Sequence, residues 1–430
     1  MSFLVEHVYL IIVGAIRAYK SIELGIIKLF SGFFINYFMF RRCEKAAIVF
    51  HVPQNLNNSI SAKDEARILE QSNYSSIIHL KINNFSFCSR ALSQGPLAIA
   101  EGYINQAWEP MGSDDQIVEL FSRFFDSKIY QLYYHPINRF LHYLEFQAFN
   151  LQTTKRAFQV AEKHYDMGND IFESFLDPWM QYSGGYWARA DNLNDAQLHK
   201  LELIAKKLDL KPGMRVLDMG CGWGTLCKYL AQNYGVECVG ITISKEGAKY
   251  AEKVCKGLNT QFRVQDYRDL NEKFDRIVSI ECIEHLGHHN YRTFFEIINK
   301  CLKNEGIFLI QIFGVNHIDI PLVDPLMHKY ILPNASFPYY LDLAKSMEGL
   351  FIIEDWHNFG LDFAKTANAW RSNFQNNWTS QLSHKYGEKF FRLFKFYLII
   401  LEALLKSRKL QLWQLVLSKD GLKREYRAAR

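Results

Sequence analysis

VLDMGCGWG, residues 216–224, is the stretch from which the rest of this 430-residue chain is best interpreted. A short apolar run reaches an acidic residue, and three glycines follow at alternate positions, Gly220, Gly222 and Gly224. Glycines in this arrangement allow the backbone to turn sharply and to lie flat against a ligand. The stretch therefore predicts a β-strand that ends in a ligand-binding loop.

The spacing of these glycines differs from that of a dinucleotide-binding loop. Such a loop reads GxGxxG and places a pyrophosphate at the start of a helix. Here the third glycine comes one residue too early, no phosphate-loop lysine follows, and Asp218 would repel a phosphate but suits a cation. S-adenosylmethionine, a sulfonium with an amino-acid tail, fits better. The candidate contacts are Asp218, Gly220, Gly222, Trp223 and Gly224.

From residue 211 onward, short β-rich runs alternate with segments of helical periodicity. This alternation is typical of a doubly wound α/β sheet. The glycine loop follows the first strand, so we predict a class I methyltransferase fold, a Rossmann-like seven-stranded doubly wound sheet. The predicted strands are MRVLDMG (214–220), VECVGIT (236–242), QFRVQD (261–266), DRIVSIE (275–281), GIFLIQIFG (306–314), LFIIEDW (350–356) and QLWQLVLS (411–418).

Further cofactor contacts are expected at the ends of the second and third strands. Many enzymes of this class place a carboxylate after the second strand for the ribose hydroxyls, but here Glu237 lies at the start of that strand. We therefore expect Thr242 near this role. Asp266 and Tyr267 are candidates for the edge and the face of the adenine, and an ordinary strand-end turn is the alternative for both.

Length and composition predict two domains in a reducing compartment. The chain exceeds one ordinary domain, and its character changes near residue 150. We expect a smaller α+β domain over 1–150 and the methyltransferase domain over 151–430. A net charge of +5 is too low for a nucleic-acid-binding protein. Eight cysteines without a CxxC spacing or a His/Cys cluster argue against disulfides and against a metal site, and favour the cytoplasm.

Three further segments lead to expectations about packing. VYLIIVGAI (8–16) and LFSGFFINYFM (29–39) are shorter than the roughly 18 residues of a spanning helix. They form either an interfacial helix pair or a segment packed on its own domain. We expect the apolar stretch 387–406 to pack against the sheet and the basic residues 423–430 to form a solvated tail.

Seven motifs make the region of roughly 150–430 resemble the cyclopropane-fatty-acyl-phospholipid synthases; the mycolic acid cyclopropane synthases are more distant. The resemblance implies methylene transfer from S-adenosylmethionine to the double bond of an unsaturated acyl chain in a membrane phospholipid. It also implies a lipid-binding N-terminal domain, peripheral association with the inner membrane face and a homodimer, and it adds Tyr182 and Ser183 to the cofactor contacts. The motifs are HYDMGND (164–170), LDPWMQYSGGYW (176–187), VLDMGCGWG, QDYRDL (265–270), IEHLGHHNY (283–291), VDPLMHKYILPN (323–334) and EDWHNFG (354–360).

The same resemblance implies a base that removes a proton from the transferred carbon. In the family this base is thought to be a bicarbonate held by Glu, Cys, His and Tyr side chains. The Glu is present as Glu284, but the other positions hold Gly184, Gln311 and Phe363. A backbone N–H at Gly184 and the amide of Gln311 can still bind an anion, whereas Phe363 lacks the hydroxyl. One lost hydrogen bond to a charge weakens bicarbonate by about tenfold or more, so Glu284 is an alternative base.

Three functions remain open from the sequence. The first is a cyclopropane synthase with an altered base site, in which Tyr182, Tyr186, Trp187 and Phe363 form an aromatic wall around a carbocation. The second is an enzyme of the same class that makes a methyl- or methylene-branched lipid or methylates another amphipathic acceptor. The third is a non-catalytic homologue that binds lipid and cofactor. Product analysis distinguishes the three.

Overall fold

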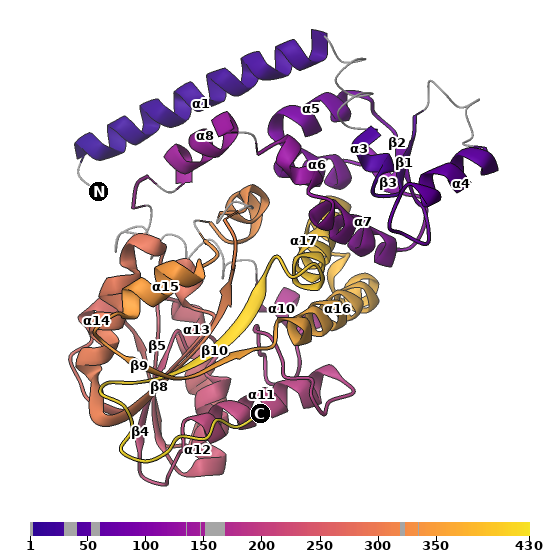
Figure 1. Cartoon of the computed structure of the whole chain (residues 1–430). Coiled ribbons are helices and arrows are strands. Elements are labelled where there is room, and N and C mark those ends of the chain that lie inside the picture. The colour runs from indigo at the N-terminus through magenta and orange to yellow at the C-terminus, as the bar shows by residue number, and fades with distance from the viewer. Residues whose placement is uncertain are drawn as a thin grey trace. The chain divides into compact units, whose positions relative to one another are not determined.

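The computed structural model describes residues 3–29, 41–52, 61–134, 136–146, 148–150, 168–318, 323–333 and 335–430. They form two compact units (Figure 1). The first comprises the described residues of Met1–Phe149 and Ser383–Lys409, and the second those of Asn150–Ile318, Leu322–Leu382 and Leu410–Arg430. Ser383–Lys409 therefore belongs to the first unit, not to the methyltransferase domain in which we expected it.

The second unit is built on a seven-stranded sheet, and all seven predicted strands are confirmed. The strand order is β6-β5-β4-β7-β8-β10-β9. β10 runs antiparallel to β8 and to β9, and all the other neighbouring strands are parallel. The chain leaves β4 in one direction and resumes at β7 on its other side, so the crevice above these two strands is a topological switch point, where ligands bind in such sheets. The strands are β4 (Arg215–Met219), β5 (Glu237–Thr242), β6 (Thr260–Val264), β7 (Phe274–Ile280), β8 (Leu302–Gly314), β9 (Ile352–Asn358) and β10 (Gln411–Ser418).

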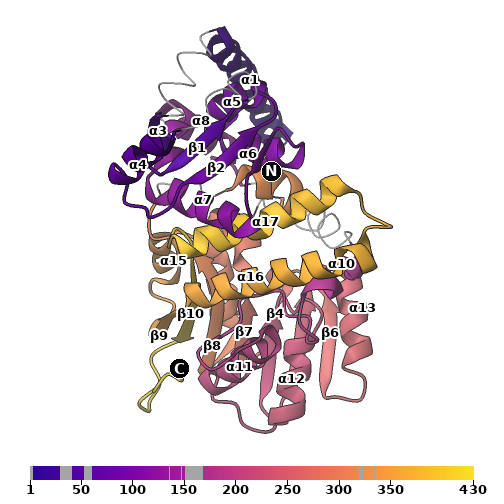
Figure 2. The ribbon, with the colours of Figure 1, turned by 90° about the vertical axis from the view of Figure 1, so that its right-hand side faces the viewer.

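Helices cover both faces of this sheet because apolar residues alternate along the strands. In β4, Val216 packs with α11 (Leu193–Lys207) and α12 (Thr225–Tyr234), while Leu217 packs on the opposite face with α14 (Tyr291–Cys301). Figure 2 shows α11 and α12 in front of the strands. The remaining helices of this unit are α10 (Asn169–Phe175), α13 (Lys245–Val254), α15 (Tyr340–Met347) and α16 (Gly360–Asn377).

The first unit is the smaller α+β domain that we predicted. Its sheet has the order β1-β2-β3, with β1 parallel and β3 antiparallel to β2. The first of the two apolar N-terminal segments lies in one continuous helix, α1, and the second falls almost entirely on residues 30–40, outside the described part, so the expected helix pair stays a prediction. The elements are α1 (Phe3–Leu29), α3 (Arg41–Glu44), β1 (Ile48–His51), α4 (Ala62–Glu70), β2 (Ile78–Ile82), α5 (Ser86–Gln94), α6 (Pro96–Ile104), β3 (Trp108–Pro110), α7 (Asp114–Asp126), α8 (Pro136–Phe146) and α17 (Glu388–Lys406).

The apolar helix α17 packs on α6 and α7 and not, as we expected, on the large sheet. The ring of Phe396 lies 5.2 Å from that of Tyr103 and 5.4 Å from that of Phe121. Arg392 Nε donates a 2.8 Å hydrogen bond to the carbonyl oxygen of Tyr103. Helical periodicity identified the apolar face of α17, but it could not identify the partner, because both cores offer apolar surface.

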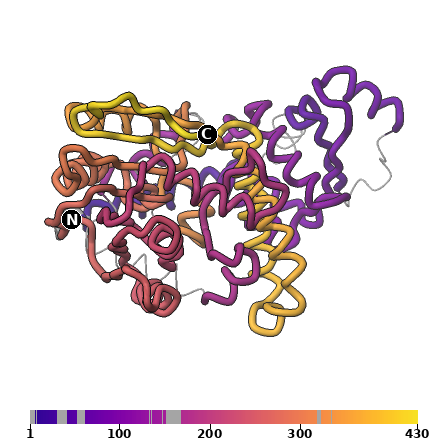
Figure 3. The backbone as a smooth tube through the Cα atoms, turned by 90° about the horizontal axis from the view of Figure 1, so that it is seen from below, coloured from indigo at the N-terminus to yellow at the C-terminus, as the bar shows by residue number. Residues whose placement is uncertain are grey.

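The basic C-terminal segment is ordered against the second unit, so the expectation of a solvated tail is wrong for its anchoring residues. Figure 3 shows the chain returning beside the preceding strands after β10. Arg430 forms an ion pair with Asp355 of β9, with Nη2 2.5 Å from Oδ1. Tyr426 donates a 2.9 Å hydrogen bond to the carbonyl oxygen of Lys207. The Arg430 side chain thus pairs with a carboxylate of the protein itself.

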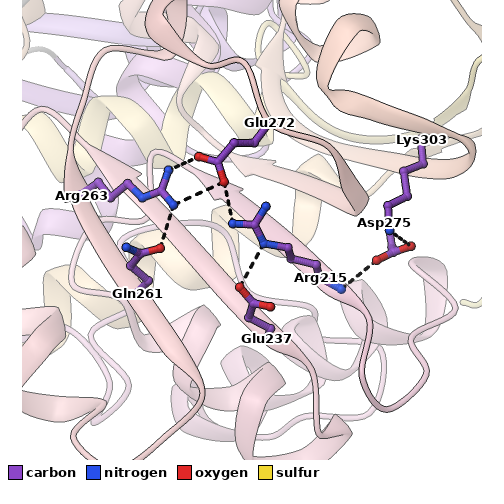
Figure 4. A network of polar contacts seen from close by, with 7 residues as sticks. All are labelled: Arg215, Glu237, Gln261, Arg263, Glu272, Asp275 and Lys303. Atoms are coloured by element: carbon purple, nitrogen blue, oxygen red, sulfur yellow. Dashed lines mark hydrogen bonds and ion pairs between the residues drawn. The ribbon is translucent and has the colours of Figure 1, made fainter.

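A network of ion pairs includes the first residues of β4 and β5, Arg215 and Glu237 (Figure 4). Arg215 Nη2 lies 2.6 Å from Glu272 Oε2 and Arg215 Nε lies 3.0 Å from Glu237 Oε1, while Arg263 also pairs with Glu272. Hydrogen bonds from Arg263 and Arg215 lower the pKa of Glu272 to about 2. Glu237 pairs with Arg215 at the start of β5, whereas a ribose contact is expected at the other end of this strand, near Thr242.

We expect Glu272→Gln to lower the free energy of unfolding by about 0.5–1 kcal/mol at neutral pH. The value is small because the Glu272 side chain is 32% exposed. The folded-state pKa lies below the unfolded one, so the stabilisation is present above about pH 4.5 and is lost as the pH falls toward 2. Urea unfolding at neutral pH and near pH 2.5 measures this, with Glu246→Gln in an exposed pair as the control. If the variant and the unaltered protein differ equally in free energy of unfolding at both pH values, the ion pairs of Glu272 are not the source of the stabilisation.

Candidate active site

The loop of residues 220–224 connects β4 to α12, and its backbone requires glycine at three positions. The φ angles of Gly220, Gly222 and Gly224 are +85°, +52° and +76°. A Cβ atom on Gly220 would lie 2.7 Å from Cys282 Sγ, which follows β7. A Cβ atom on Gly222 would meet nothing within 4 Å. The loop is therefore tightly packed on the β7 side and open at Gly222, as a ligand-binding cradle must be.

Two predicted cofactor contacts are brought together beside this loop by α10. The ring of Phe172 lies 5.0 Å from that of Trp223 and 5.2 Å from that of Tyr182. Trp223 Nε1 donates a 3.2 Å hydrogen bond to Asn169 Oδ1. His164 to Met167 of the HYDMGND motif lie outside the described residues.

Two of the residues expected around the ribose and adenine, Thr242 and Asp266, accept hydrogen bonds from residues two positions further along the chain. The Thr242 hydroxyl accepts the N–H of Ser244 at 3.1 Å. Both Asp266 oxygens accept hydrogen bonds from Arg268, each at 2.9 Å. The ring of Tyr267 lies in the hydrophobic core under the sheet. Asp266 and Tyr267 thus form a strand-end turn, and their contact with the edge and the face of an adenine stays a prediction.

On the sheet face that α11 covers, three strands each carry a polar side chain among apolar ones. Asp218 shares this face with Val216, and Gln311 and Gln414 occupy the corresponding positions of β8 and β10. All three are at most 2% exposed. Because buried polar groups require partners, this face must contain a polar network.

Lys200 of α11 is the cation of this network. It is fully buried, and its Nζ donates hydrogen bonds to Gln181 Oε1 at 2.8 Å and to Ser183 Oγ at 2.5 Å. Burial lowers its pKa to about 8, although the carboxylates of Glu281 and Asp218 act to raise it. Burial likewise raises the pKa of Asp218 to about 7. Ser183, which we predicted as a cofactor contact, is therefore a hydrogen-bond partner of this lysine, and the charge of Asp218 acts on it.

Glu281, directly after β7, connects two of the predicted base-site residues. Its Oε1 accepts the N–H of Gly184 at 2.9 Å and the amide of Gln311 at 2.8 Å. Gln311 in turn accepts a 2.9 Å hydrogen bond from Gln414. Burial raises the pKa of Glu281 to about 7, opposed by these hydrogen bonds and by Lys200. Its φ of +48° costs about 1–3 kcal/mol in a residue with a side chain, and such strain clusters at functional sites.

The other two predicted base-site residues lie in the same cluster. Glu284 Oε1 accepts the N–H of Phe313 at 2.6 Å, while its buried Oε2 has no hydrogen-bond partner among the described residues. Burial and the charge of Glu281 raise the pKa of Glu284 to about 8. The ring of Phe363 is 1% exposed and stacks on Phe313 at 4.9 Å. The structure thus brings together Gly184, Gln311, Phe363 and Glu284.

The four aromatic residues that we expected in one wall form two groups. Tyr182 and Phe363 both pack against Trp370 of α16, with ring centroids 5.3 Å and 5.5 Å away. The ring of Tyr186 instead contacts His357 and Phe359, and Trp187 donates its indole N–H to Thr366 at 2.9 Å. Only Tyr182 and Phe363 have a common aromatic partner.

Four residues of this site were missed by the sequence analysis: Glu281, Lys200, Gln414 and Trp370. Glu281 had a detectable signal, since a charged residue ends an otherwise apolar strand run. Lys200 and Trp370 had none, because polar and aromatic residues inside helices are usual on any face. In the described part of the chain, no group of three or more His, Cys, Asp and Glu side chains could hold a metal ion.

Comparison with known proteins gives concordant matches. Residues 152–415 match the family described as mycolic acid cyclopropane synthetase. The chain is 44% identical to the cyclopropane-fatty-acyl-phospholipid synthase of Escherichia coli K12, over 82% of this chain and 90% of that protein. It is 30% identical to sphingolipid C9-methyltransferase A of Emericella nidulans, over 60% of this chain and 53% of that protein. Among solved structures, the mycolic acid cyclopropane synthase CmaA1 with SAH and CTAB is 27% identical and superposes with a TM-score of 0.58. The match covers 61% of this chain and 98% of that one.

Proposed function

The chain belongs to the mycolic acid cyclopropane synthetase family, and on this premise we propose that it converts unsaturated acyl chains of membrane phospholipids into cyclopropane fatty acids. It is an S-adenosylmethionine-dependent methyltransferase. The observation that carries the proposal is the pair of carboxyl groups, Glu281 and Glu284, at the switch point beside the glycine loop. Methyl transfer by itself removes no proton from the transferred carbon, whereas ring closure needs a base that does.

The residues present fit S-adenosylmethionine, which supplies an activated methyl group when bound. The open face at Gly222 leaves room for a ligand against the backbone. Trp223 and Tyr182 offer aromatic surface beside it. We propose that the cofactor contacts are Gly220, Gly222, Trp223, Gly224, Tyr182 and Thr242. Ser183 acts mainly by accepting a hydrogen bond from Lys200 in the segment before Gly184, and Asp218 lies buried in the field of this cation.

An alkene is a weak nucleophile, so the protein must align it and exclude water. Phe313 and Phe363, stacked beside the carboxyl groups, provide an apolar surface on which an acyl chain can lie. Their π-faces favour the positive charge that develops on the lipid. The carboxyl groups below them receive the proton that must leave for the ring to close.

A second product is supported by one comparison. The Emericella nidulans relative is named for methylation at a sphingolipid carbon. Because Gly184, Gln311 and Phe363 replace the expected base-site side chains, the lipid cation could lose a different proton and leave a branched, unsaturated chain. Both products require the same methyl transfer.

The test is to incubate the purified protein with S-adenosylmethionine and vesicles of mono-unsaturated phospholipid, and to analyse the released fatty acids by mass spectrometry and proton NMR. Upfield cyclopropane signals on chains one CH2 heavier are expected. The same mass gain with olefinic signals would establish the branched product. No mass gain, with cofactor binding intact, would contradict both.

We also propose that the first unit docks on the cytoplasmic face of the membrane through α1. One stripe of α1, the α1 stripe, carries exposed apolar side chains, whereas Val13, Ile16 and Ile27 are buried on the other side. No described helix is both long and apolar enough to cross a bilayer. An interfacial helix fits these two observations. The α1 stripe consists of Val8, Ile11, Ile22, Ile26 and Leu29.

We expect the double variant Ile11→Asp/Ile22→Asp to bind phospholipid vesicles at least about 100-fold more weakly. Each isoleucine contributes about 1.5–3 kcal/mol when it leaves water, and 1.4 kcal/mol is tenfold. Vesicle co-sedimentation measures the effect. Met111→Asp, which alters a residue of similar exposure in the same unit, is the control. Unchanged vesicle binding, with a dimer lost in light scattering, would assign the α1 stripe to a second copy of the chain.

A further inference from the structure

The hydrogen-bond donors expected to hold a bicarbonate are already used inside the protein. The N–H of Gly184 and the amide nitrogen of Gln311 both donate to Glu281 Oε1, at 2.9 Å and 2.8 Å. The Gln311 amide nitrogen also donates to the carbonyl oxygen of Gly184 at 3.3 Å, so both of its protons are occupied. Phe363 has no donor. These residues do not fit a bound bicarbonate.

Packing around Gly184 supports the same conclusion. A Cβ atom on Gly184 would lie 2.5 Å from a methyl carbon of Leu412 and 2.9 Å from the ring of Phe363. The space that a side chain at this position would use is therefore filled by apolar groups. The departures from the family pattern at 184, 311 and 363 are consequently one coordinated rearrangement around Glu281.

We propose that the carboxylate of Glu281 takes the place of the bound anion and is the base that accepts the ring-closing proton. This inference rests on the proposed function and adds a residue to it. No exogenous anion is then required, because the protein supplies the carboxylate itself.

The position of Glu281 suits this role. It follows β7 on one side of the switch point, and the glycine loop follows β4 on the other. Its neighbour Cys282 lies directly against Gly220. Glu281 remains partly accessible while Gly184 and Gln311 beneath it are buried. Among the described residues, none donates a hydrogen bond to its second oxygen, Oε2, so this atom is available to a substrate.

The surrounding groups favour the charged form of one carboxyl and the protonated form of the other. Glu281 accepts two hydrogen bonds, and the buried Lys200 cation acts on it. Glu284 accepts one backbone hydrogen bond and is repelled by Glu281. The charged form is therefore held on Glu281, and the proton on Glu284. The left-handed backbone at Glu281, which a side chain disfavours, is maintained to direct this carboxylate at the site.

The proton transfer balances without another reactant. The lipid carries a carbocation next to the carbon that bears the new methyl group. A C–H bond of this methyl breaks, and its proton bonds to Oε2 of Glu281. The electron pair of that C–H bond forms the third C–C bond of the ring and discharges the cation. Glu281 is left as a neutral carboxylic acid and returns the proton to solvent after the product leaves.

The experiment combines turnover with direct anion binding, on Glu281→Gln and Glu281→Gly in the full chain. Glycine tolerates the +48° backbone, so the second variant introduces no strain. We expect both variants to lose about 10²–10⁴-fold in turnover. Millimolar bicarbonate should restore Glu281→Gly at least about tenfold and leave wild type unchanged, because the freed donors of Gly184 and Gln311 can hold the anion. Glu237→Gln, in the network of Figure 4, is the control with unchanged turnover.

Equilibrium dialysis with labelled bicarbonate gives a readout that does not depend on the reaction. The wild-type protein should bind none, and Glu281→Gly should bind one per chain. Stoichiometric binding to wild type, or turnover of Glu281→Gln within about tenfold of wild type, would overturn the proposal. A wild-type protein that forms no altered lipid would contradict the proposed function instead, and dialysis would still decide whether Glu281 occupies the anion position.

Discussion

Replacing Gly220 by valine is expected to weaken S-adenosylmethionine binding by at least about 30-fold. A φ of +85° costs a residue with a side chain about 1–2 kcal/mol. In addition, the new Cβ would lie 2.7 Å from Cys282 Sγ, so the loop or the end of β7 must move. Together these effects exceed about 2 kcal/mol, and 1.4 kcal/mol is tenfold in affinity. Isothermal titration of the purified variant measures the loss.

Gly213→Val is the matched control for this experiment. Gly213 has nearly the same backbone angle, +82°, and a Cβ atom there would meet nothing within 4 Å. This variant should lose about 1–2 kcal/mol of stability while its affinity for the cofactor stays within about twofold. If Gly220→Val binds as tightly as Gly213→Val, the loop does not hold the cofactor.

Replacing Lys200 by methionine is expected to lower both stability and turnover. The buried carboxyls of Glu281 and Asp218 would lose a cation that acts on both. The buried oxygens of Gln181 and Ser183 would lose a charged hydrogen-bond donor, and each buried group left without its partner costs about 1–3 kcal/mol. Without this cation the pKa of Glu281 rises above about 7, so less of it is charged at neutral pH. The loss of the hydrogen bonds to Gln181 and Ser183 also loosens the segment before Gly184. We expect about 100-fold lower turnover at neutral pH.

Lys207→Met provides the comparison on the same helix. Lys207 is also fully buried, and its Nζ lies 3.0 Å from Asp355 Oδ2, outside the site. It should lose stability without losing turnover per folded molecule. The rate–pH profile separates the roles: Lys200→Met should shift toward higher pH, whereas Lys207→Met should not. An equal loss of turnover in both variants would show that Lys200 acts only through the fold.

The seven strands and the glycine loop could be predicted because their signals are local. Alternation of apolar residues encodes which strand faces are buried, and a left-handed turn such as that at Gly220 is readily formed only by glycine. The assignment of α17 failed for the complementary reason. Its apolar face shows that it is buried, but the partner depends on which core has matching space, and this is a property of the assembled chain.

At the base site, too, some features could be predicted from the sequence and others only from the tertiary structure. The sequence by itself determined that Glu284 is present, that Gly184 and Gln311 retain N–H donors, and that Phe363 lacks the expected hydroxyl. Only the tertiary structure decided what these donors bind, because Gly184, Glu281 and Gln311 come from a loop, the end of β7 and β8, which are distant in sequence. A hydrogen bond depends on distance and direction between such segments, and its partner cannot be identified from residue type alone. Folding brings the Glu281 carboxylate between two donors that appeared to be unpaired.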